Sequence, residues 1–216
     1  MKNNESGRSM IEMLGVLAII GVLSVGGIAG YSKAMGKFKV NKCVDQLTQI
    51  VASTRALFAG HKDYSALGTA GAGTTTKTCS TTAINGPLIK QGHLVPEDML
   101  TTDSNGKDAL ENPFMGSVIL SCGKKRSADT GNKAFIIIYN SVPKDLCIEL
   151  ATQDWGAGAS SGLIGVCVNK DVSGEYLGGT SAFADGNGCA VGEAMSVGNA
   201  STACKNALNS IYWKFY

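Results

Sequence analysis

The spacing of apolar and polar residues divides the first quarter of the chain into two kinds of helix. Residues 13–32 carry no charge, and at about 1.5 Å per residue a helix of this length spans about 30 Å, the thickness of a bilayer's hydrocarbon core. In residues 33–58 the apolar positions recur at intervals of three and four, which is typical of an amphipathic helix. Because residues 1–86 contain no proline, we predict one continuous helix over residues 9–58 that ends near Gly60.

Beyond this helix, runs of β-branched and aromatic residues predict an antiparallel sheet. We predict strands over residues 117–122, 134–139 and 162–169, with a helix over residues 143–153 between the last two. At the end of the chain three apolar residues, Ile211, Trp213 and Phe215, alternate with Tyr212, Lys214 and Tyr216. This alternation predicts a half-buried terminal strand. The order of elements predicts an α+β fold in which a long N-terminal helix packs on an antiparallel sheet.

Glycine and proline mark the loops between these elements. We expect a Gly/Thr loop over residues 68–76, a short helix with turns over 84–100, a tight turn over 112–116 and a Gly-rich excursion over 172–198. The 216 residues therefore provide one globular domain of ordinary size in addition to the helix.

Cysteine usage indicates the compartment of this domain. Six of the seven cysteines lie between Cys79 and Cys204 without a C-x-x-C pair, which favours a disulfide framework over a zinc site, whose ligands come in close pairs. His61 and His93 are isolated in the sequence, so we expect neither a metal nor a cofactor. Six cysteines allow about 15 connectivities, so the pairing does not follow from their spacing.

Charge and short motifs argue against several other functions. Charged residues make up 17% of the chain and the net charge is +2, too balanced for nucleic-acid binding. Residues 158–162 match G-x-S-x-G, but no histidine follows, so we expect a loop and no catalytic residue. Residues 103–108 resemble a calcium loop without its final glutamate, which favours a solvated turn. Residues 199–201 fit a glycosylation acceptor, a match that arises easily by chance.

A single carboxylate stands at the head of the apolar run. Glu12 has apolar neighbours on both sides, and a charge that enters hydrocarbon costs about 2.5 kcal/mol or more. Glu12 either marks the membrane edge, where charges are tolerated, or has a cationic partner. Gly7 lies five residues upstream, and after Arg8 only small or apolar residues precede the glutamate.

This head resembles the type IV prepilin signal. The resemblance implies that a membrane peptidase cuts after Gly7 and methylates the new N-terminus at Arg8, where the family usually has Phe or Met. It also implies that Glu12 attracts the N-terminal ammonium of the neighbouring subunit and so sets the register of a growing filament. The order of elements, with a helix over residues 143–153, resembles the type IVb subclass.

The resemblance implies a domain layout. Residues 1–7 would be a leader peptide, 8–32 a transmembrane and filament-core helix, 33–59 its amphipathic continuation, and 60–216 a globular pilin head with the αβ-roll fold. The lysines that follow the apolar run favour a cytoplasmic head by the positive-inside rule, whereas the cysteines favour a periplasmic one. We expect a periplasmic head, because the prepilin-like signal implies a cytoplasmic leader.

The resemblance also implies a disulfide pattern for the C-terminal region. The family's bridge around this region corresponds to Cys147 with Cys204. The remaining cysteines of the head are then expected to pair locally, as Cys79–Cys122 and Cys167–Cys189. Cys43, on the apolar face of the long helix, is left over as a small buried hydrophobe.

The first hypothesis for function is a non-catalytic structural subunit of a type IV pilus. It implies an inner-membrane protein with a periplasmic domain before assembly and a cell-surface filament afterwards. The implied partners are further copies of the chain, prepilin peptidase, the assembly machinery of the inner membrane, and membrane lipid before assembly. The alternatives are a type II secretion pseudopilin or minor pilin, and a membrane-anchored periplasmic binding module or enzyme, which needs a convergent polar site.

Overall fold

The computed structural model covers the long helix and most of the domain that follows it. The described residues are 6–67, 69–70, 77–79, 92–104, 106–125, 129–156, 161–169 and 188–216. The chain divides into two compact units, Met1–Lys39 and Val40–Tyr216. The division falls inside the first helix, so this helix belongs to both units.

The long helix, α1, runs from Ser6 to Phe58 and confirms the prediction of one continuous helix. It ends just before Gly60, where the His61 N–H donates to the Phe58 carbonyl at 2.9 Å and closes a turn. In the second unit α1 buries residues spaced by three and four, because such positions share one face of a helix. The stripe consists of Val40, Cys43, Leu47 and Ile50.

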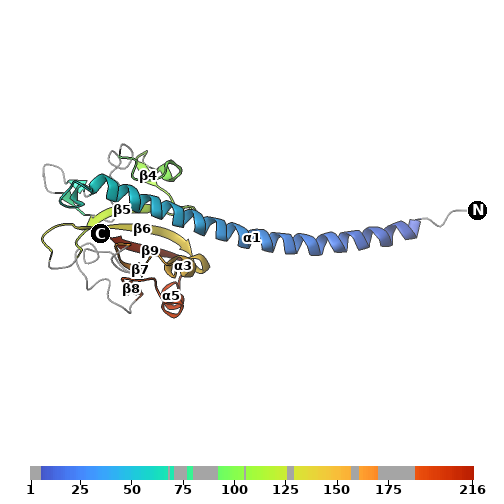
Figure 1. Ribbon diagram of the computed structural model, residues 1–216. Helices are drawn as coiled ribbons and strands as arrows, with labels where there is room; N and C mark the ends of the chain where they lie inside the picture. Colours follow the sequence, from blue (N-terminus) through green and yellow to red (C-terminus); the bar gives the residue numbers. More distant parts are fainter. Residues whose placement is uncertain are drawn as a thin grey trace, which may run out of the picture. The chain divides into compact units, whose positions relative to one another are not determined.

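A five-stranded antiparallel sheet forms the centre of the second unit, in the order β5-β6-β9-β7-β8. The strands are β5 (Val118–Gly123), β6 (Ala134–Pro143), β7 (Leu163–Val168), β8 (Cys189–Val191) and β9 (Leu208–Phe215). Figure 1 shows the end of α1 lying along this sheet. The core between them joins the buried stripe of α1 to Phe135, Ile137 and Tyr139 of β6 and to Ile211, Trp213 and Phe215 of β9.

The terminal strand differs from its prediction. Alternation predicts a half-buried strand, whereas β9 lies in the middle of the sheet between β6 and β7, and Tyr212 and Lys214 are buried as well. Tyr212 belongs to a second apolar cluster on the opposite face of the sheet, with Ile136, Ile138, Cys167 and Cys189. Tyrosine and lysine side chains carry enough apolar surface to be buried. Counting Tyr212 and Lys214 as polar therefore led to the prediction of one solvent-exposed face.

Several short elements complete the second unit. The helix α3 (Lys144–Ala151) follows Pro143 as predicted, and it buries Cys147, Leu150 and Ala151. The turn before β5 is also confirmed, because the Met115 N–H donates to the Asn112 carbonyl at 3.0 Å. Two further pieces are the single-turn helices η1 (Ser65–Leu67) and η2 (Glu97–Met99).

The predicted loops contain more regular structure than expected. The strand β1 (Thr69–Ala70) lies inside the Gly/Thr loop and pairs with β2 (Lys77–Thr78), which directly follows the loop. The polar turn after residue 102 joins a hairpin of β3 (Leu100–Thr102) and β4 (Asp108–Leu110), and β8 falls within the predicted Gly-rich excursion. A helix, α5 (Val197–Ala203), precedes Cys204. Residues 84–91 of the expected short helix and residues 172–187 of the excursion lie outside the described residues.

Candidate assembly site

The predicted processing and register residues lie at the start of α1. The backbone of Gly7 and Arg8 is helical, and Glu12 follows on an exposed turn. The apolar neighbours of this carboxylate are exposed as well, with 73% of the Ile11 surface and 61% of the Met13 surface accessible. Glu12 is therefore a single charge within an apolar collar that the isolated chain leaves uncovered.

The apolar collar continues along the whole first unit. Large side chains point outward on every side of the helix from Met10 to Tyr31, and the most apolar window of α1 has no residue buried inside the chain. Among the described residues, α1 is the one helix long and apolar enough to cross a membrane, by length and composition. A helix that is apolar all round requires either a bilayer or packing against other helices.

The glycines of this segment leave space for such packing. A Cβ added at Gly15, Gly21 or Gly26 would meet no heavy atom within 4 Å other than its chain neighbours and the helix's own nearby backbone. The structure therefore gives no reason within the chain for these glycines. Small residues on apolar helices allow neighbouring backbones to approach closely.

In the second unit, Arg55 ties α1 to the end of the sheet. Its Nε donates to the carbonyl of Tyr216 at 3.1 Å, and Nη2 donates to the carbonyl of Ser161 at 2.6 Å. The guanidinium carbon also lies 5.8 Å from the centroid of the Phe215 ring. Gly162 has φ +64° beside this group, and a Cβ there would overlap the guanidinium. Sequence reasoning missed this contact, because its acceptors are backbone carbonyls more than a hundred residues away.

On another side of α1, a polar contact joins the helix to η2. Lys42 Nζ lies 2.7 Å from a carboxylate oxygen of Asp98, and Gln46 Nε2 donates to the same oxygen at 3.2 Å. Both charged side chains of the ion pair are more than a third exposed, so water screens the attraction and the pair adds little stability. The contact links α1 to η2, which directly precedes β3.

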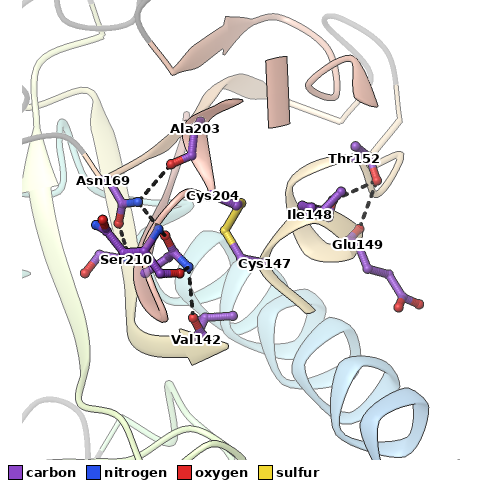
Figure 2. Close-up of a disulfide and its surroundings, with 11 residues drawn as sticks. Val142, Cys147, Ile148, Glu149, Thr152, Asn169, Ala203, Cys204 and Ser210 are labelled. Atoms are coloured by element: carbon purple, nitrogen blue, oxygen red, sulfur yellow. Dashed lines mark hydrogen bonds between the residues drawn. A yellow bond between two sulfur atoms is a disulfide. The ribbon is translucent and has the colours of Figure 1, made fainter. Parts of the chain in front are cut away.

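Three disulfides brace the second unit. They join Cys79 to Cys122, Cys147 to Cys204, and Cys167 to Cys189, with Cα separations of 5.1, 6.0 and 4.0 Å. These are the three pairs named from the sequence, and Cys43 is the buried cysteine left over. Figure 2 shows the Cys147–Cys204 bridge connecting α3 with the segment that follows α5.

An amide network lies beside this bridge and holds the start of β9. Asn169 Nδ2 donates to Asn209 Oδ1 and to the Ala203 carbonyl, and its Oδ1 accepts from the Ser210 N–H (Figure 2). Asn209 Nδ2 in turn donates to the Val142 carbonyl. Asn169, which follows β7, bonds to Ser210 in β9, and Asn209 in β9 bonds to Val142 in β6. The network therefore links these three strands at one end of the sheet. Asn169 has φ +51°, a conformation that asparagine tolerates well.

Burial alters the protonation of two side chains of the sheet. Desolvation lowers the pKa of Lys214 to about 8, although the carboxylate of Asp129 opposes the shift. Desolvation also raises the pKa of Tyr139 well above its usual value. Both groups lie in the interior of the head. The ionisable side chains that act on their pKa values are Asp129 for Lys214, and Cys43 and Asp98 for Tyr139.

The motifs set aside on sequence grounds show ordinary structural roles. The Lys107 N–H donates to Asp103 Oδ1 at 2.8 Å, and Gly106 has φ +75°, so this segment is a hairpin turn. No group of three metal-ligating side chains occurs within the described residues. Residues 158–160 of the G-x-S-x-G match lie outside them, and Ser161 Oγ donates to the Gly156 carbonyl. Asn199 lies in α5, where its N–H donates to Ser196.

Comparison with known proteins gives similarities over most of the chain. A family model described as PilS N terminal matches residues 38–214. The "major structural subunit of bundle-forming pilus" is 25% identical in Escherichia coli O127:H6 and 22% identical in Escherichia coli O111:H-. Each alignment spans 205 residues and covers 95% of this chain and 90% of the relative.

Two solved structures match this chain over most of its length. The type IVb pilin of Salmonella typhi matches with a TM-score of 0.49 and 19% identity, over 78% of this chain and 96% of that one. TcpA, a type IV pilin of Vibrio cholerae El Tor, matches with a TM-score of 0.49 and 12% identity, over 82% and 99% of the two chains.

Proposed function

Since the chain belongs to the PilS N-terminal family, we propose that it is a structural subunit of a type IV pilus. The relatives that cover nearly the whole chain are named as pilus structural subunits, which supports a structural role over a catalytic one. The observation that carries the proposal is the first unit, a helix with apolar side chains exposed on all sides and one carboxylate near its start. Such a surface suits a membrane before assembly and a helical filament core afterwards.

Processing of the N-terminus follows from the same proposal. Prepilin peptidase removes residues 1–7, and Arg8 becomes the methylated N-terminus of the mature subunit. The second unit stays on the periplasmic side of the inner membrane, where its three disulfides form. The assembly machinery of the inner membrane then transfers the subunit from lipid to the filament.

Glu12 acts in this transfer as the register residue. Its carboxylate is exposed among apolar side chains, so a bilayer leaves it without a hydrogen-bonding environment. The N-terminal ammonium of a neighbouring subunit supplies the opposite charge at the same depth. Pairing the two charges removes most of the burial penalty of each, and it is possible only at one stagger of adjacent helices.

The test replaces Glu12 by Gln, which keeps the size of the side chain and removes its charge. We expect normal levels of the variant in the inner membrane and a loss of surface filaments counted by electron microscopy. Asp45→Asn is the matched control, because it makes the same change at an exposed position of α1 beyond the apolar run. Normal filament numbers for Glu12→Gln would show that the glutamate is only an interfacial charge.

A further inference from the structure

Among the described residues of the second unit, a hollow borders α1 on each side of its buried stripe. The first, about 310 Å³, includes Lys42 and Gln46 of the helix together with Glu111 and Met115. The second, about 270 Å³, includes Val51, Ala52 and Arg55 of the helix together with Trp155 and Phe215. At about 100° per residue, Lys42 and Gln46 lie on one flank of the stripe and Ala52 and Arg55 on the other. Figure 1 accordingly shows β4 and β7 on opposite sides of α1.

Met115, at the edge of the first hollow, is an apolar side chain held outward. It is 83% exposed, although its turn is otherwise well fixed. Asn112 Oδ1 accepts the N–H groups of Phe114 and Gly116, and Asn112 Nδ2 donates to the Asn140 carbonyl. Met115 has φ +65°, a conformation that a methionine adopts only with strain. A rigid turn that exposes a strained methionine suggests a contact outside the chain.

The second hollow has the properties needed to receive an apolar side chain. The rings of Trp155 and Phe215 and the side chains of Val51 and Ala52 provide its apolar lining. Methionine is flexible and polarisable, so it fills irregular spaces of this kind and packs well against aromatic rings. The chain's own Met115 cannot reach this hollow, because it lies on the other flank of α1.

The charges around the two hollows are complementary. Glu111 borders the hollow beside Met115, whereas Arg55 borders the hollow lined by Trp155. The hydrogen bonds of Arg55 to the Tyr216 and Ser161 carbonyls use two of the five N–H donors of a guanidinium. A carboxylate that arrives with Met115 therefore meets a cation at the rim of the second hollow.

We propose that Met115 of one subunit inserts into the hollow between α1 and Trp155 of the next subunit, with Glu111 beside Arg55. The inference rests on the proposed filament function. It identifies the residues through which the heads of neighbouring subunits contact each other. The inserting side chain and the receiving hollow lie on opposite flanks of the same helix, so the contact is heterologous. Such a contact repeats without closing and builds an open helical filament, whereas a two-fold contact between like flanks would leave the hollow empty.

The first test replaces Met115 by Asn, a residue that tolerates positive φ and lacks the apolar side chain. We expect the head to remain folded and at least as resistant to protease, while filament counts fall about tenfold or more, as for a buried contact at the centre of an interface. Val197→Asn is the matched control, because Val197 is 68% exposed and borders neither hollow. Equal filament counts for Met115→Asn and the wild type would overturn the inference.

The second test works from the receiving side. Ala52→Trp fills the hollow at an exposed helical position, so we expect the same loss of filaments with a folded head. Wild-type filaments containing photo-methionine should cross-link the peptide of Met115 to a peptide of the hollow in another subunit. Normal filament counts for Ala52→Trp would refute the contact. They would mean that the hollow does not receive a side chain of another subunit during assembly and holds at most a small apolar ligand. Absence of the wild-type chain from surface filaments would instead overturn the proposed function itself.

Discussion

The burial of Lys214 offers a test of the head's energetics through pH. This lysine lies in the central strand with no accessible surface, and desolvation lowers its pKa from 10.5 to about 8. Below pH 8 the folded head must therefore carry a proton that its environment disfavours. In the unfolded chain the same lysine keeps its proton up to about pH 10.5, so the free energy of unfolding contributed by this group rises with pH between the two values.

The size of the effect follows from the shift. At about 1.4 kcal/mol per pKa unit, a decrease of this size corresponds to a penalty of roughly 3 kcal/mol at pH 7. At pH 9.5 the folded form has released its proton, and the penalty falls by about 2 kcal/mol. Lys214→Met removes the charge and keeps much of the apolar side chain. We expect the variant to be more stable than the wild type at pH 7, with an advantage that shrinks toward pH 9.5.

The assay is urea unfolding of the full chain in detergent, followed by tryptophan fluorescence at both pH values. Trp155 and Trp213 report on the head, because both belong to the second unit and their rings lie 5.9 Å apart. Lys205→Met serves as the control, since Lys205 is exposed and its replacement should change little at either pH. A Lys214→Met advantage that is the same at pH 7 and pH 9.5, or absent at both, would refute the desolvation argument.

Two further predictions concern the bracing of the head, each measured by the same urea assay. Replacing Cys147 and Cys204 together by Ala should lower the free energy of unfolding by up to about 4 kcal/mol, because the bridge closes a 57-residue separation; a loss below that of the Cys167–Cys189 pair, separated by 22 residues, would contradict the loop-closure reasoning. Arg55→Lys should cost about 2–3 kcal/mol, because an ammonium cannot donate to two carbonyls in the fork geometry of the guanidinium; a stability equal to that of the wild type would show that these bonds are replaced by water.

The parts of the fold that sequence predicts are those in which periodicity reflects burial. The helix over residues 33–58 has apolar positions at helical spacing because that face packs on the sheet, and the structure confirms it. The strands β5, β6 and β7 are likewise continuous apolar runs, because the sheet buries them almost completely. In these segments local pattern and tertiary packing select the same structure.

The missed elements are short and depend on distant partners. The strand β8 has only three residues and forms because Cys189 pairs across to Cys167 in β7. The helix α5 is glycine- and threonine-containing, with weak intrinsic preference, and it is held by its Ser196 cap and the bridge at Cys204. The two cysteine pairs were expected from the family resemblance, but neither segment has a local pattern that predicts a strand or a helix, so both elements were missed.

The candidate site divides in the same way. Gly7, Arg8 and Glu12 were proposed from a contiguous signature, since the residues proposed for processing and register lie close together at the start of one helix. Arg55 and Met115 were not, because their significance depends on carbonyls, turns and hollows that only the folded head assembles. The turn around Met115 was predicted, but its exposure was not, since an apolar residue in a turn gives no sign of which way it points.

The two units differ in what completes their structure, and this difference explains how one chain can serve in both a membrane and a filament. The second unit encloses a hydrophobic core and contains three disulfides. The first unit buries almost nothing, and its apolar surface must be covered by lipid or by other helices. When the first unit moves from lipid into a bundle of helices, its apolar surface stays buried in apolar surroundings, so the net free-energy change from burial is small. In the function that we propose, direction comes from the carboxylate of Glu12, which lipid solvates poorly within the apolar run, and from the proposed lateral contact between heads, which lipid cannot provide.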